Sequence, residues 1–132
     1  MHTLAQSYKA VSLIRPVVAT ATATGSGVDL LGFLDDAMAI VDFGVLSGTA
    51  ATNIVTIEGS NDNSAFTVLT TFVAASGTDD AKIASGRVNL TGYRYVRAVA
   101  TIAGTTPSYA FGVTLLVRAE AGLATLNSLT AA

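Results

Sequence analysis

The sequence predicts an all-β chain that folds as an antiparallel, jelly-roll-like β-sandwich of seven to eight strands. Apolar and polar residues alternate in short runs, residues typical of turns separate these runs, and Glu and Lys, which favour helices, are scarce. A chain of 132 residues has room for one domain. The expected strands, in order, are 15–24, 28–30, 37–46, 53–60, 66–72, 87–90, 93–102 and 109–118.

The N-terminal strands are predicted from their alternation. In 15–24, Thr alternates with Val and Ala, a glycine–serine turn follows, and 28–30 is a short apolar run. In 37–46, the odd-numbered positions from Ala39 to Val45 share one face. Both faces of this strand are mostly apolar, as in a central strand or one covered by another subunit. Asp42 interrupts the longest apolar run of the chain and is a candidate interface residue.

A hairpin and a loop are predicted in the middle of the chain. In 53–60, Val55 and Ile57 face inward, and a turn rich in Asn and Asp closes a hairpin onto 66–72. The segment 74–86 is polar and contains Gly, so it is expected to be a loop.

Three more strands are predicted before the C-terminal segment. The run 87–90 is short, and 93–102 has a consistent apolar face from Val96 to Ile102. The clearest alternation is in 109–118, where every second residue from Tyr109 onward is large and apolar.

The domain organisation follows from these strands. Residues 15–118 are expected to form the sandwich, residues 1–14 an N-terminal arm, and residues 119–132 a C-terminal arm or tail. The C-terminal segment carries leucines at a three-residue spacing, either in a frayed tail or in an arm that packs on a neighbouring subunit. These leucines, Leu123, Leu126 and Leu129, are candidate interface residues.

Composition narrows the possible partners. Hydrophobic residues make up 51% of the chain and charged residues 12%, against about 25% charged in typical domains. Part of the surface is therefore expected to be covered by a partner. A net charge of −2 with scattered arginines argues against nucleic acid, and no apolar run reaches the length of a membrane span. The N-terminal segment lacks the pattern of a signal peptide, so a soluble, unprocessed product is expected.

No catalytic, cofactor or metal site is predicted, so an enzyme is not expected. The chain has no cysteine, and its one histidine is His2. The adjacent pairs Asp35–Asp36 and Asp79–Asp80 are expected to be solvated loop charges. Asp62 and its neighbours match a tight turn better than a calcium loop.

A cluster of tyrosine and arginine provides the remaining candidate interface. In an extended strand Tyr93, Tyr95 and Arg97 would point the same way, away from the apolar face that contains Val96. Tyr and Arg are common in the centres of protein interfaces. The alternative is that the tyrosines only pack and cap a corner of the sandwich.

Three segments carry a resemblance to a known family when they are taken together. They are Val28-Asp29-Leu30-Leu31-Gly32-Phe33, the stretch from Ile57 to Val68 around Ser60-Asn61-Asp62-Asn63-Ser64, and Gly92-Tyr93-Arg94-Tyr95-Val96-Arg97. Their order resembles small β-sandwich head proteins of tailed bacteriophages, especially capsid decoration (cement) proteins. The resemblance covers roughly residues 28–118.

This resemblance implies a structural virion protein, made in the cytoplasm of the bacterial host, that binds the outside of a capsid and stabilises it by bridging its subunits. The implied partners are the major capsid protein and further copies of the chain, as a homo-oligomer and often as a trimer. The family has no catalytic residues to carry over. Two alternatives stay open: a carbohydrate-binding or adhesin-like sandwich module, and another structural component of a phage head or tail.

Overall fold

Seven antiparallel strands make up the computed structural model, which describes residues 8–31, 33–75, 79 and 81–119. None of these described residues lies in a helix. The strands are β1 Tyr8–Ala19, β2 Ala23–Thr24, β3 Val28–Asp29, β4 Phe33–Ser60, β5 Thr67–Ala75, β6 Lys82–Asn89 and β7 Tyr95–Ala119. The predicted all-β, antiparallel class is confirmed.

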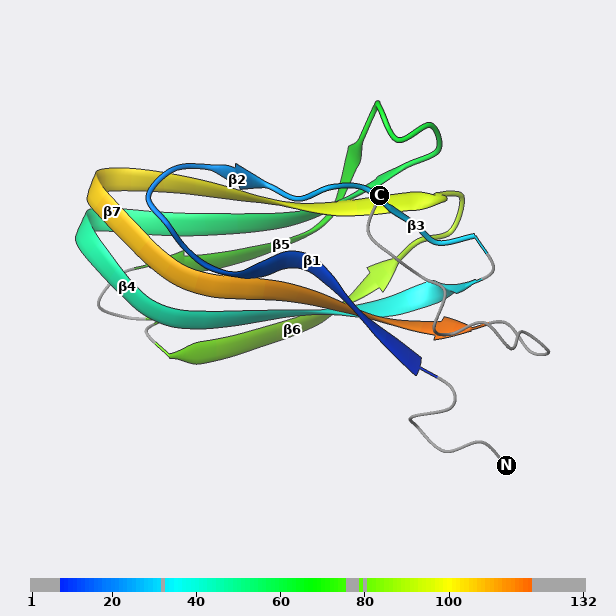
Figure 1. The fold of residues 1–132 in the computed structure, drawn as a ribbon, viewed down its shortest axis with the longest axis horizontal. Coiled ribbons are helices and arrows are strands. Elements are labelled where there is room, and N and C mark those ends of the chain that lie inside the picture. Colours follow the sequence, from blue (N-terminus) through cyan, green and yellow to red (C-terminus); the bar gives the residue numbers. More distant parts are fainter. Residues whose placement is uncertain (1–7, 32, 76–78, 80, 120–132) are drawn as a thin grey trace.

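Two long, bent strands, β4 and β7, organise the molecule. The first half of β4 pairs with the second half of β7, and the second half of β4 pairs with the first half of β7. Both strands turn back near the same end, which stacks the two halves as layers (Figure 1). The first layer contains β1, the second half of β7, the first half of β4, and β6. The second layer contains β2, β3, the first half of β7, the second half of β4, and β5. The sandwich is thus one open, folded sheet.

The core lies between the two layers and is almost entirely apolar. Alternate residues of β4 and β7 point into it, because side chains on a strand alternate between its faces. The predicted inward faces around Val55 and Ile57, from Val96 to Ile102, and from Tyr109 to Val117 are confirmed. The largest fully buried side chains are Tyr109, Phe43, Ile57, Leu90, Leu115, Val28, Val41, Val55, Val88, Val96, Val113 and Val117.

The bend depends on residues with positive φ. Gly48 in β4 has φ 115°, and Gly104 in β7 has φ 120°, a region that favours glycine. A Cβ on Gly104 would lie 2.6 Å from the Cα of Ala51. The backbones of the two paired strands therefore approach each other closely where the layers join.

Two expected boundaries differ from the structure. The arm expected over residues 1–14 is wrong for Tyr8–Ile14, which form the first part of β1 and pair with β7. Val11, Leu13 and Ile14 are buried there, so packing of apolar side chains extends the sheet. The loop expected over 74–86 is also wrong in part, because β6 begins at Lys82 and pairs with β4.

A shift in register changes one face of β4. Pairing with β7 skips between Phe43 and Leu46, so the alternation is interrupted there. Phe43 and Leu46 are buried, whereas Val45 is 70% exposed. The prediction that Val45 shares the face of Phe43 is wrong for this reason.

Candidate protein-interaction surface

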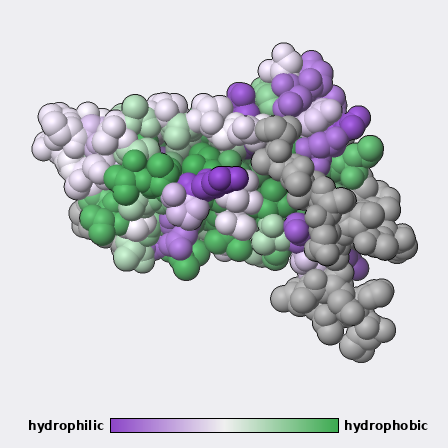
Figure 2. Space-filling view, viewed as in Figure 1, coloured by the Kyte–Doolittle hydropathy of each residue, from purple (hydrophilic) through white to green (hydrophobic). Residues whose placement is uncertain are grey.

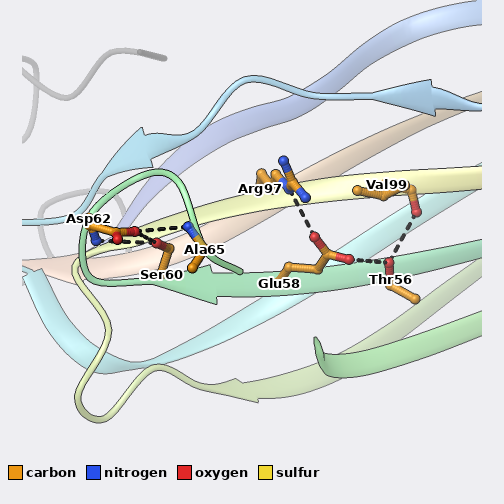
Figure 3. A network of polar contacts seen from close by, with 7 residues as sticks. All are labelled: Thr56, Glu58, Ser60, Asp62, Ala65, Arg97 and Val99. Carbon is orange, nitrogen blue, oxygen red and sulfur yellow. Dashed lines mark hydrogen bonds and ion pairs between the residues drawn. The ribbon is translucent and has the colours of Figure 1, made fainter. Parts of the chain in front are cut away.

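Arg97 is held by side chains of its own chain on the outer face of the second layer. Its Nε donates to Oε1 of Glu58, 2.8 Å away, directly across from it in the β4–β7 pair. Thr56 Oγ1 lies 3.4 Å from Oε2 of Glu58 and 3.4 Å from the carbonyl oxygen of Val99 (Figure 3). The guanidinium also lies over the ring of Phe66, 3.9 Å from its centroid. Arg97 thus joins β4, β7 and the residue before β5.

We expect Arg97→Ala to lower the free energy of unfolding by about 1–2 kcal/mol, because Glu58 would lose the partner of a part-buried carboxylate. The side chains of Arg97 and Glu58 are 30% and 15% exposed. Arg87→Ala is the matched control, since the Arg87–Asp36 pair is 73% and 65% exposed and should contribute much less to the free energy of unfolding. Urea denaturation measures both; equal losses would contradict a stabilising role for the Arg97 contacts.

The sequence predicted that Tyr93 and Tyr95 share one face of a strand, but Tyr93 lies outside the strand. Tyr93 precedes β7, in a turn where its N–H donates to the carbonyl of Leu90. Its ring packs on Gly59, where a Cβ would lie 2.8 Å from the Tyr93 Cγ. Tyr95 begins β7 and is half-buried. Tyr93 therefore packs against the sandwich, and Tyr95 and Arg97 are the members of the cluster that lie opposite the buried Val96.

Arg94, next to Tyr95, ties the start of β7 to β3. It makes a two-point contact with Asp29, with its Nε and Nη2 2.9 and 2.8 Å from the carboxylate oxygens. These hydrogen bonds lower the pKa of Asp29 from its ordinary value and raise that of Arg94. The guanidinium also lies 5.2 Å from the centroid of the Tyr95 ring. The charges of this region are thus largely satisfied within the chain.

The outer face of the first layer is mainly apolar, in contrast to the paired charges around Arg94 and Arg97. A groove of about 600 Å³ crosses it over β1, β7, β4 and β6. Hydrophobic side chains gather on the part of the surface around β1 and the second half of β7 (Figure 2). The groove is lined by Pro16, Val17, Val18, Ile40, Asp42, Gly44, Ile83, Ala110, Phe111, Gly112 and Thr114. We call this the β1–β6 groove.

Asp42 is the charged residue of the β1–β6 groove. It is exposed, and it lies directly between Gly112 of β7 and Ile83 of β6 in the strand pairing. No described residue forms an ion pair or hydrogen bond with its carboxylate. The structure thus places this predicted candidate in an apolar groove and leaves its charge unpaired.

The other candidates are not brought to this groove. Tyr95 and Arg97 lie on the second layer, so the candidates form two separate surfaces. Leu123, Leu126 and Leu129 lie outside the described residues. Sequence reasoning missed the aliphatic walls of the groove, because Val17, Ile83 and Ile40 come from three strands that only the pairing brings together.

Asp62 has the role of a turn residue. Its Oδ1 accepts hydrogen bonds from the hydroxyl of Ser60 and the backbone N–H of Ala65 (Figure 3), and a third from the backbone N–H of Ser64, each 2.9 Å long. These bonds lower its pKa. Over the described ranges, no group of three acidic or histidine side chains is placed to hold a metal ion. That part of the chain also contains no helix long and apolar enough to cross a membrane.

Comparison with known proteins places the fold. No protein-family model matches the chain, and no curated protein matches it. Among solved structures, PBSX exported protein XepA aligns with a TM-score of 0.60 and 19% identity over 91% of this chain and 39% of that one. A chain in the structure of the infectious bursal disease virus Gx strain aligns with a TM-score of 0.51 and 14% identity over 93% and 34%.

A third similar structure is that of SPBc2 prophage-derived protein YomS, with a TM-score of 0.48 and 13% identity over 83% of this chain and 93% of that one. The chain spans about two fifths of XepA and one third of the viral chain. At these identities the likeness shows the fold alone. The sandwich thus shares its fold with part of XepA and with part of a chain in the infectious bursal disease virus structure.

Proposed function

We propose that this chain is a non-enzymatic structural virion protein that binds the outside of a phage capsid and stabilises it by bridging capsid subunits. The β1–β6 groove is the observation that carries the proposal, since an exposed apolar surface of this kind on a small domain marks a protein-interaction site. The shared fold of a virus-particle chain supports it, as does the resemblance to decoration proteins. The interaction is non-covalent and uses the face of a sheet.

The character of the exposed apolar side chains favours a protein partner over a carbohydrate. Sugar-binding surfaces stack sugar rings on exposed aromatic faces. Here every tyrosine and phenylalanine is buried or half-buried. The large hydrophobic side chains that the described residues expose are Val17, Val18, Leu31, Met38, Val45, Ile54, Val68, Val73 and Ile83.

The proposed partners are the major capsid protein and further copies of the chain, with a trimer as the expected assembly. A charged share of 12% leaves little charge to keep a monomer soluble, so contact with other subunits accounts for the composition. A closed trimer on a local symmetry axis would present three copies of the same groove to the shell. Binding at several points increases avidity without new kinds of contact.

Co-sedimentation tests the proposal. The probe is particles of the phage whose genome carries the gene, produced with this gene deleted; particles of an unrelated phage are the control. We expect saturable binding to the first particles alone, together with a higher temperature of particle disruption. Absence of binding, or a gene located away from any capsid gene, would contradict a capsid role.

A further inference from the structure

Asp42 differs from the other acidic residues whose side chains the structure describes. Asp29, Asp36, Asp79 and Glu58 each contact an arginine or lysine of the same chain within 3 Å. Asp62 is bound by the turn that it organises. Among these described acids, Asp42 is the one without a partner for its carboxylate. Each of the other described acidic side chains thus has a partner within the chain, and that of Asp42 is open to a partner from outside.

The surroundings of Asp42 make this arrangement informative. A protein segment that fills the β1–β6 groove has to take the carboxylate out of water, because Asp42 lies among the groove's lining residues. Covering a charge is unfavourable unless the partner supplies an opposite charge or hydrogen-bond donors. A purely apolar partner would therefore be rejected, and a partner with one basic side chain would be accepted.

The shape of the groove fits a long basic side chain. Gly112, directly opposite Asp42 in the strand pairing, has no side chain of its own, and Pro16 lies over it, 3.4 Å from where a Cβ would be. Gly44 also lacks a side chain, and Ala110 packs against it, 3.1 Å from where a Cβ would lie. Aliphatic side chains of Val17, Ile40 and Ile83 form the walls. The methylene stem of an Arg or Lys can pack on such walls while its charged end reaches a carboxylate.

We propose that the β1–β6 groove binds a capsid-subunit segment in which one Arg or Lys lies between apolar residues, and that Asp42 pairs with this cation. This inference rests on the proposed function and names the chemistry of the partner. Aliphatic contacts hold the segment, and the ion pair sets which segment is accepted and in what register. Asp42 is thus a specificity-determining residue of the docking surface.

The test measures binding of purified protein to the gene-deleted phage particles at several salt concentrations. Asp42→Asn keeps the size of the side chain and removes its charge, and we expect it to weaken binding about tenfold or more and to flatten the salt dependence. Asp42→Glu keeps the charge and should retain most of the salt dependence. Asp62→Asn makes the same charge change in the β4–β5 turn and should leave particle binding unchanged.

A genetic experiment identifies the partner's charge. Phage that carry Asp42→Lys should no longer form decorated particles, and revertants that recover decoration should replace an Arg or Lys of the capsid protein by Asp or Glu. Such a charge exchange supports the pair directly. Revertants that only restore Asp42, or that change apolar residues of the capsid protein alone, would overturn it.

The outcomes separate this inference from the proposed function. If the unaltered protein fails to bind the particles, the proposed function is wrong and the inference falls with it. If it binds and Asp42→Asn binds equally well, the function stands and the Asp42 pair is wrong. If Asp42→Asn instead alters sedimentation of the free protein and leaves particle binding unchanged, a second copy occupies the groove and the inference is overturned.

Discussion

Replacing Phe43 by Ala should lower the free energy of unfolding by about 3–5 kcal/mol, the usual cost of removing a fully buried aromatic side chain. Phe43 is 1% exposed and points between the layers from the first half of β4. Its loss would leave a cavity against Phe111, its partner in the pairing with β7. Urea or thermal denaturation of the purified variant measures the effect.

Val45→Ala is the matched control two residues further along the same strand. Simple alternation would place Val45 beside Phe43, with a loss of one or more kcal/mol on truncation. Because the register shift exposes Val45, we expect a change of less than about 0.5 kcal/mol. A loss similar to that of a buried valine would contradict the bulge and support unbroken alternation.

The pair Phe43 and Val45 also shows which parts of the fold the sequence could predict. Alternation correctly predicts the strands of β4 and β7 and most of their inner faces, because burial of one face selects every second residue. A bulge inserts a residue without changing that local pattern, so it is invisible in the sequence. Likewise, residues 37–46 and 53–60 predict two strands, and only packing shows them to be halves of one bent strand.

The candidate site was predictable only where one residue departed from its neighbours. Asp42 was found because a charge interrupts an apolar run. Its groove could not be predicted, since Asp42 and Gly112 become neighbours only through pairing of strands far apart in sequence. For the same reason, Arg97 could be placed opposite Val96, but its contacts with Glu58 and Phe66 could not be foreseen.

The bend that joins the layers is expected to tolerate substitution least. Gly104 combines two demands: a φ of 120°, which L side chains rarely adopt, and a close approach to the backbone of β4. The strained backbone alone costs about 1–3 kcal/mol for a residue with a Cβ. Steric overlap with the Cα of Ala51 adds to this, because backbone there cannot move without separating β4 from β7.

We therefore expect Gly104→Ala to lower the free energy of unfolding by more than about 3 kcal/mol, a large part of the 5–15 kcal/mol typical of a domain. Gly92→Ala is the matched control: Gly92 also has a positive φ, 85°, but a Cβ there would meet no atom within 4 Å. The free energy of unfolding of the Gly92→Ala variant should fall only by the cost of backbone strain, about 1–2 kcal/mol. Urea denaturation of both variants compares them directly. Equal losses would mean that strain alone acts at Gly104, whereas a larger loss there shows that the close approach of β7 to the β4 backbone at the bend leaves no room for a side chain.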